Sequence, residues 1–181
     1  MLNHQFTLYC FISDYDQNYI KNLDNKINII FRNYETKLNF EKLKNLCKFC
    51  KSKGKKIFLA NEPKMALNLG FDGVYVPSFN KTANLNSYKG NNSFTVLGSA
   101  HNYKEIKDKE RQGIDIIFIS PVFKVKKSKK FLGVVKFNLL SMLTNKKTIA
   151  LGGINESNFK KLKLLRADGF SSISFFKKKG P

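Results

Sequence analysis

Tryptophan is absent from this chain, and acidic residues, cysteines and long apolar runs are all scarce. No run approaches the ~18 apolar residues that a membrane-spanning helix needs, so the sequence predicts no membrane segment. The first ten residues lack a basic region followed by a small-residue cleavage site, so we expect no signal peptide and a cytoplasmic location. Because 42% of the 181 residues are hydrophobic, we expect one globular domain over residues 1–181.

The three cysteines are too few and too irregularly placed for a disulfide framework. Cys47 and Cys50 form a C-x-x-C pair, but no third or fourth ligand lies nearby in the sequence to complete a zinc site. A redox pair of this kind opens a helix directly after a strand, whereas this pair lies well inside a helical pattern. We therefore interpret the cysteines as packing residues.

Negative charge is scarce, because 13 acidic residues oppose 33 Lys and Arg and leave a net charge of +20. Such a charge attracts phosphorylated metabolites, nucleic acid or an acidic membrane surface. The lysines are spread along the whole chain, which favours solvated lysine faces as the explanation. No basic helix or aromatic platform accompanies the charge, so we expect no specific nucleic-acid partner. Local clusters lie at residues 124–130 and 177–179.

Eight short apolar runs alternate with helical patterns along the chain. Several runs are continuous, such as 27–31 and 114–119, which is typical of strands buried on both faces of a parallel sheet. The alternation predicts a TIM (β/α)₈ barrel, with a doubly wound sheet as the alternative. Because few residues follow the eighth run, we expect a trimmed barrel whose last helix is missing. The predicted strands are 6–12, 27–31, 56–60, 73–76, 94–97, 114–119, 148–151 and 169–173.

Four stretches have helical spacing of their apolar residues. The first covers residues 40–50 and ends at Gly54, the second begins at Tyr103 and ends at Gly113, and the third is short, at 137–143. The fourth covers 159–165, and Asn155 or Ser157 is available as its N-terminal cap.

In an α/β barrel the residues just after each strand face the active site. Arg32 follows the second strand and suits phosphate oxygens, or else forms an ion pair with Asp14 or Glu62. Gly152 and Gly153 follow the seventh strand, where glycine lets backbone N–H groups approach an anion, or simply permits a tight turn.

The fifth strand is followed by two further candidates. His101 could transfer a proton near neutral pH, or could be a structural, hydrogen-bonded histidine. Ser99 could donate to a phosphate or satisfy the local backbone. The lysine cluster at 124–130 could close over an anionic substrate as a mobile loop, with one functional lysine, or could be a solvated loop.

These strand ends, in this order, resemble those of the thiamine phosphate synthase/TenI family. The resemblance runs over almost the whole chain, and the Pro-Val-Phe and Leu-Gly-Gly-Ile motifs at the sixth and seventh strand ends are fairly specific together. The stretches that carry it are 30–34 (IFRNY), 70–76 (GFDGVYV), 98–102 (GSAHN), 119–123 (ISPVF) and 150–155 (ALGGIN).

The resemblance implies a TIM barrel and a transferase reaction of thiamine biosynthesis. Hydroxymethylpyrimidine diphosphate is joined to a thiazole phosphate, and diphosphate is released. Cationic side chains and Mg²⁺ stabilise the leaving diphosphate in such chemistry. The implied partners are small phosphorylated substrates, and association into a homo-oligomer is possible because family members often associate.

Residue by residue, the resemblance implies diphosphate binding by Arg32 and Asn61 and a phosphate contact by Ser99. Gly153, beside Gly152, matches the backbone phosphate donor after the seventh strand.

Four other positions are implied with less specific alignment. Ile173 and Ser174 look like the pair that completes the thiazole-phosphate site. The loop lysine corresponds to Lys127, in a catalytic role with Arg32, or to Lys129, in substrate binding.

Several positions depart from the family pattern. A family lysine is Tyr34 here, and the family's two metal-binding aspartates fall at Glu62 and Asn80. Glu62 can still hold Mg²⁺ through oxygen, whereas Asn80 is a neutral and weaker ligand. The threonine after Pro-Val-Phe falls near Val125, which removes one phosphate donor.

His101 matches the acid/base of TenI-type thiazole tautomerases, so a thiazole tautomerase is one alternative function. A non-catalytic barrel that binds thiazole phosphate or thiamine phosphate is the other.

Overall fold

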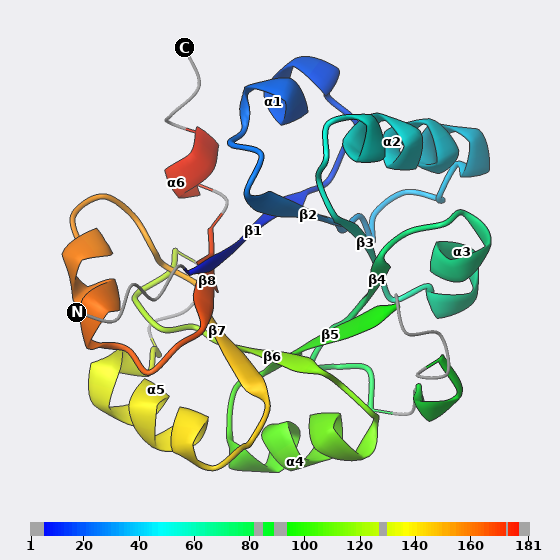
Figure 1. Ribbon diagram of the computed structural model, residues 1–181. Helices are drawn as coiled ribbons and strands as arrows, with labels where there is room; N and C mark the ends of the chain where they lie inside the picture. Colours follow the sequence, from blue (N-terminus) through cyan, green and yellow to red (C-terminus); the bar gives the residue numbers. More distant parts are fainter. Residues whose placement is uncertain (1–5, 82–84, 89–93, 127–129, 173, 178–181) are drawn as a thin grey trace.

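The chain folds into a closed barrel of eight parallel strands, seen along its axis in Figure 1. The computed structural model describes residues 6–81, 85–88, 94–126, 130–172 and 174–177. Each strand pairs with the next along the chain, and β8 pairs with β1 to close the ring. The helices lie outside this ring, so the prediction of a TIM barrel is confirmed.

The order of elements follows the predicted alternation. The strands are β1 (Thr7–Ile12), β2 (Ile27–Phe31), β3 (Ile57–Ala60), β4 (Gly73–Val76), β5 (Thr95–Ala100), β6 (Ile116–Ile119), β7 (Lys147–Leu151) and β8 (Gly169–Ser171). The α-helices are α1 (Gln17–Asn22), α2 (Phe40–Ser52), α3 (Pro63–Asn68), α4 (Tyr103–Arg111), α5 (Gly133–Met142) and α6 (Ser174–Lys177), and the 3₁₀-helices are η1 (Asn86–Tyr88) and η2 (Phe159–Leu164).

The last predicted helical stretch was wrong in type and in its cap. It forms the 3₁₀-helix η2, preceded by Asn158, whose side chain makes no capping hydrogen bond. The Asn155 side chain is used elsewhere, because its Oδ1 accepts the backbone N–H groups of Ser157 and Asn158 in a local turn. Within the described residues, the four-residue helix α6 follows β8, so a short helix is present where the last helix was predicted to be missing.

The barrel interior is a small aromatic core. Phe118 lies at its centre, with its ring centroid 5.0 Å from that of Tyr9 and 5.6 Å from that of Tyr75, both edge to face. The larger core lies between the strands and the surrounding helices. The inward-facing side chains belong to Tyr9, Phe11, Ile30, Phe58, Ala60, Tyr75, Leu97, Phe118 and Ile149.

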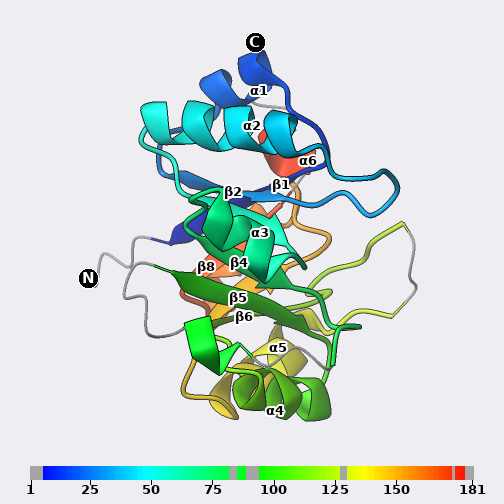
Figure 2. The same cartoon turned by 90° about the vertical axis from the view of Figure 1, so that its right-hand side faces the viewer.

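The carboxyl ends of the strands share one end of the barrel. Figure 2 shows the described parts of the loops after β2 and β6 projecting from this end. The segments after β6 and β7 are joined, because Val122 N–H donates to Leu151 C=O at 2.9 Å and Phe123 N–H to Gly152 C=O at 3.0 Å. This end of the barrel therefore carries the candidate site.

Among the described helices, none is long and apolar enough to cross a membrane. The three cysteines are buried and form no disulfide, which confirms that they pack in the core. Burial raises the pKa of the Cys50 thiol to about 12, so this thiol stays protonated at neutral pH.

Candidate active site

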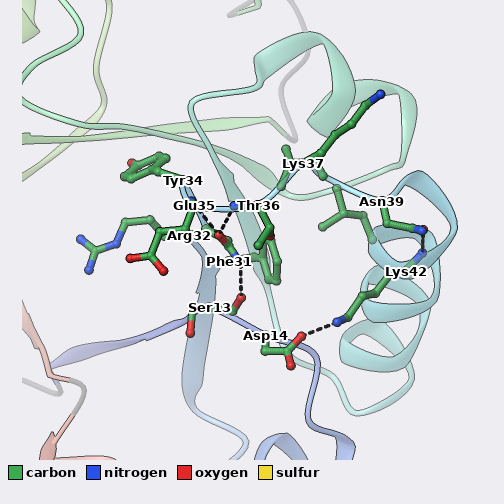
Figure 3. Close-up of a pocket in the computed structure, with 13 residues that line it drawn as sticks. Ser13, Asp14, Phe31, Arg32, Tyr34, Glu35, Thr36, Lys37, Asn39 and Lys42 are labelled. Carbon is green, nitrogen blue, oxygen red and sulfur yellow. Dashed lines mark hydrogen bonds and ion pairs between the residues drawn. The ribbon is translucent and has the colours of Figure 1, made fainter.

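Arg32 follows β2 and is held at the barrel mouth by aromatic residues. Its guanidinium carbon lies 4.5 Å from the centroid of the Phe11 ring, and its charge lowers the pKa of the nearby Tyr75 hydroxyl against the effect of burial. Asp14 pairs with Lys42 of α2 instead, and among the described ion pairs none joins Arg32 to Asp14 or Glu62. Figure 3 shows the Arg32 side chain pointing away from the Asp14–Lys42 pair. Arg32 is thus oriented without a carboxylate partner, which suits an anion-binding role.

Tyr75 lies between two predicted site residues, and nothing in the sequence assigned it such a role. It comes from β4, is 2% exposed, and is close enough to Arg32 and Ser99 for both to lower its pKa against the effect of burial. Burial raises the pKa of Tyr75, so it remains a neutral hydroxyl at the floor of the mouth. The one hint in the sequence was the residue type, because the hydroxyl of a tyrosine in an otherwise apolar buried strand needs a hydrogen-bonding partner.

Ser99 lies inside β5 and not after it, which corrects the predicted end of that strand at residue 97. It pairs in register with Phe118 of β6, and Ala100 pairs with Ile119. Ser99 is 5% exposed, and it lies on the same inward face of β5 as Leu97, two residues before it. Small residues at 98–100 suggested a loop, but the hydrogen bonds of the neighbouring strands hold them in the sheet.

His101 follows β5 directly and is bonded through both ring nitrogens. Nδ1 lies 2.7 Å from the carbonyl oxygen of Ser120, and Nε2 lies 3.0 Å from the hydroxyl of Ser78. A carbonyl oxygen only accepts, so Nδ1 carries a hydrogen and donates it to Ser120. This arrangement fixes the orientation of the imidazole at the barrel opening, and its predicted part in proton transfer stays a prediction.

The start of α4 fixes the backbone of His101. Asn102 caps the helix by accepting the N–H of Glu105 at 3.0 Å, and its own side-chain amide donates to the Glu105 carboxylate at 2.9 Å. The same carboxylate accepts the backbone N–H of His101 at 2.8 Å. This variant of the capping box fixes the backbone of residue 101 at the start of α4.

Asn61 follows β3 in a left-handed conformation with φ of 64°. Its backbone N–H donates to Tyr75 C=O at 2.8 Å, and its side-chain oxygen accepts the Asn80 amide at 2.7 Å. Asparagine tolerates this conformation better than most residues do. The structure therefore brings Asn61 and Asn80 together, as neighbours at the ends of β3 and β4.

Glu62 and Asn80 are the positions that could hold Mg²⁺. Glu62 is exposed at the start of α3, where its side chain makes no capping hydrogen bond to the helix. Asn80 reaches Asn61 through its amide nitrogen. Within the described part of the chain, no group of three or more His, Cys, Asp or Glu side chains is placed to hold a metal. Mg²⁺ commonly uses one or two carboxylates with substrate phosphates, so these residues fit an ion shared with a diphosphate.

Gly152 and Gly153 are required by close packing at the end of β7. A Cβ on Gly152 would lie 2.8 Å from Pro121 Cβ, and one on Gly153 would lie 2.5 Å from the carbonyl oxygen of Phe123. Both have positive φ, 94° and 72°. The tight-turn interpretation is therefore correct as far as the backbone goes, and a phosphate contact by Gly153 stays a prediction.

The remaining predicted residues lie where side chains are not described. Lys127, Lys129 and Ile173 fall outside the described residues. Ser174 is the first residue of α6, directly after the end of β8, but its side chain is also outside the description. Their assigned roles stay predictions.

Two hollows flank Arg32. One of about 830 Å³ is lined by the end of β1, the end of β2 and the start of α2, and includes Lys37 and Lys42 (Figure 3). The other, of about 530 Å³, lies at the end of β1 and includes Tyr19. Arg32 lines both, so an anion in either hollow would meet its guanidinium.

A family model described as thiamine monophosphate synthase matches residues 21–176. The chain belongs to this thiamine monophosphate synthase family. The match takes in every described candidate residue from Arg32 to Gly153.

Two named members of the thiamine monophosphate synthase family can be compared over part of their length. The thiamine-phosphate synthase of Prochlorococcus marinus is 30% identical over 123 residues, which are 66% of this chain and 35% of that protein. The chain therefore matches only about a third of that relative's length. A candidate second thiamine-phosphate synthase of Aquifex aeolicus is 32% identical over 127 residues, 68% of each chain.

Solved structures support the same barrel. Thiamine phosphate pyrophosphorylase from Pyrococcus furiosus superposes with a TM-score of 0.73 at 19% identity, covering 93% of this chain and 86% of that one. FabK from Thermotoga maritima gives the same TM-score of 0.73 at 15% identity, covering 97% of this chain and 61% of that one. Because differently named proteins fit equally well, the superpositions show the fold alone.

Proposed function

We propose that this chain is a transferase of thiamine biosynthesis that condenses hydroxymethylpyrimidine diphosphate with thiazole phosphate and releases diphosphate. One observation carries the proposal: Arg32 and Ser99 converge on the buried Tyr75 hydroxyl at the carboxyl end of the strands. Donors fixed before the reaction stabilise charge that develops on a leaving group. The names of the two relatives support the same reaction class.

In the proposed reaction the C–O bond between the pyrimidine methylene group and the diphosphate breaks, and the electron pair leaves with the diphosphate. The thiazole nitrogen then forms the new C–N bond to the methylene carbon. Arg32 suits the leaving diphosphate because its guanidinium is permanently charged, planar and already stacked on Phe11. The Gly152–Gly153 turn, across the mouth after β7, would receive the thiazole phosphate through backbone N–H groups.

Glu62 would supply one carboxylate for Mg²⁺, with Asn80 beside Asn61 as a neutral oxygen ligand. A bound Mg²⁺ would offset the charge of the leaving diphosphate. Asn61 itself would bind the diphosphate, since its amide position is fixed by Asn80. The proposal therefore includes metal dependence.

The test is a condensation assay with both substrates, with Mg²⁺ or with EDTA, followed by detection of thiamine phosphate. We expect product only with Mg²⁺. In Arg32→Lys, which keeps the charge and loses the planar fork, we expect kcat/KM to fall by about tenfold or more. No product at micromolar enzyme with Mg²⁺ would refute the transferase proposal.

A second candidate, a metal-independent thiazole tautomerase, is favoured by the geometry of His101. Ser120 fixes its Nδ1, so Nε2 could take a proton from one atom of the thiazole and return it to another. The measurement is tautomerisation in EDTA by the wild type and by His101→Ala. Full activity in the variant would remove this candidate, and phosphate binding without turnover in either assay would leave a barrel that only binds.

A further inference from the structure

A buried lysine lies behind the candidate site, on the helix that follows His101. We propose that Lys109 of α4 is a positioning residue, whose ammonium fixes the β4 loop (residues 77–80) and thereby orients His101 and Asn61. The inference deepens the proposed function, on which its importance for catalysis rests, but its geometry stands independently of the reaction.

Lys109 is 1% exposed and uses its ammonium entirely on groups of the protein. Nζ donates to Pro77 C=O at 2.9 Å and to Asn80 C=O at 2.7 Å, the two ends of the β4 loop. It also donates to Gln112 Oε1 at 2.7 Å. Three donors thus meet three acceptors, which is the full hydrogen-bonding capacity of an ammonium group.

Gln112 completes the same cluster from the end of α4. Its side-chain nitrogen donates to Asn80 C=O at 3.1 Å, so that carbonyl accepts from both α4 side chains. The Gln112 amide is consequently held in one orientation, with oxygen toward Lys109. An apolar residue at position 109 would leave buried carbonyls without a donor, which is costly.

The β4 loop carries the partners of two site residues. The Ser78 hydroxyl lies 3.0 Å from His101 Nε2. Asn80 donates its amide to Asn61 at 2.7 Å. Both contacts come from the four residues whose ends Lys109 holds, so a displaced loop would release both at once.

Lys109 acts behind the loop and not at the mouth, since its Nζ contacts only main-chain oxygens and Gln112. The acidic residues that favour its charged form are Glu105 and Asp108, both on α4. No substrate atom needs to touch it. It is therefore a positioning residue. Its loss should change the geometry of the site more than a core substitution that lowers the stability of the protein by a similar amount.

The test compares Lys109→Met with Leu46→Ala. Methionine keeps the length and apolar stem of the lysine, while the Leu46 variant removes a fully buried side chain of α2 from the outer core. For each variant we would measure the free energy of unfolding, amide hydrogen exchange in the β4 loop, and the ring nitrogen chemical shifts of His101, which report its hydrogen bonds. Binding of inorganic diphosphate with Mg²⁺ is measured by calorimetry.

We expect both variants to lose stability but only Lys109→Met to alter the site. In that variant exchange in the β4 loop should rise, the Nε2 chemical shift of His101 should change because the contact with Ser78 is lost, and diphosphate affinity should fall by about tenfold. Gln112→Leu, a milder change to the same cluster, should shift all three in the same direction by less. Gln112→Leu replaces Lys109→Met in the comparison if Lys109→Met does not fold.

Equal loop exchange, His101 chemical shifts and diphosphate affinity in the Lys109 or Gln112 variant and in Leu46→Ala would overturn the inference, leaving Lys109 a core residue only. The proposed function fails separately, by absence of condensation in the wild type. The loop exchange and the His101 chemical shifts do not depend on that reaction, so the two failures are distinguishable.

Discussion

At the residue scale, the hydroxyl of Tyr75 is the point where the site meets the barrel core. It lies next to both Arg32 and Ser99, which come from different strands at the opening of the barrel. The Tyr75 hydroxyl and the Phe11 ring are therefore the two groups that flank the Arg32 guanidinium at the barrel opening.

Tyr75→Phe removes that oxygen and keeps the ring. We expect the variant to fold and to bind inorganic diphosphate about tenfold or more weakly, as measured by calorimetry. Tyr9→Phe is the matched control, because Tyr9 is buried in the same inner cluster. Equal affinities in the two variants would show that Tyr75 does not organise the anion site.

The glycine after β7 gives a second prediction at this scale. Gly153→Ala places a Cβ 2.5 Å from a main-chain oxygen, whereas at Gly54, also at positive φ, a Cβ would meet nothing within 4 Å. Both alanine variants carry backbone strain, but only Gly153→Ala must move the neighbouring loop. We expect it to lower the free energy of unfolding by about 1–3 kcal/mol more than Gly54→Ala, in urea unfolding. Equal losses would contradict the close packing.

Arg32, His101 and the glycine pair could be found from sequence because each directly follows a buried strand. Tyr75 could not, because β4 is apolar and buried along its whole length. Without alternation between polar and apolar residues, nothing in the sequence says which face of the strand points into the barrel. Lys109 was missed for a related reason: a lysine on a charged helix is expected to be solvated.

At the scale of elements, aromatic rings of α6 and η2 cover the outer face of β8. Phe175 and Phe176 of α6 pack on Phe170 of β8, with ring centroids 6.0 and 5.9 Å away. Phe159 of η2 stacks on Phe175 at 4.7 Å. A four-residue helix thereby covers the outer face of β8.

Phe176→Ala should therefore destabilise the protein by about 3 kcal/mol, as for a buried core phenylalanine. Phe176 is 6% exposed, whereas Phe40 at the start of α2 is 50% exposed and provides the control. We expect Phe40→Ala to change the urea midpoint little. A similar small change for Phe176→Ala would mean that α6 contributes nothing to the barrel.

Element types were predictable where burial and period agreed, and β2 and β4 match their predicted bounds. Element types and bounds were not predictable where tertiary contacts outweighed the local conformational preference of the residues. The sheet draws residues 98–100 into β5 despite their small side chains, and a local turn at Asn155 leaves η2 without the predicted cap. Bounds of this kind depend on neighbouring strands and turns that a single sequence does not specify.

At the scale of the whole molecule, stability at alkaline pH depends on groups whose pKa values shift in opposite directions on folding. Burial lowers the pKa of Lys109 from 10.5 to about 8, so between these values the unfolded chain binds the proton that the folded chain has lost. Stability from this group therefore rises with pH above about 8. Burial raises the pKa of Cys50 from 9.0 to about 12 and that of Tyr9 from 10.0 to about 12, so there the folded chain keeps the protons and stability falls.

These opposing titrations predict that the free energy of unfolding rises from pH 8 to a maximum slightly above about pH 9 and then falls, because the gain from Lys109 is offset only once the Cys50 thiol and the Tyr9 hydroxyl of the unfolded chain ionise. Between pH 8 and 9 Lys109 alone contributes a gain of about 1 kcal/mol, since one pKa unit corresponds to about 1.4 kcal/mol. Urea unfolding from pH 7.5 to 10 measures the curve. Lys109→Met should lose the rise and keep the fall, so the difference between the two curves isolates the lysine. A difference independent of pH would mean that Lys109 titrates in the folded protein as it does in water.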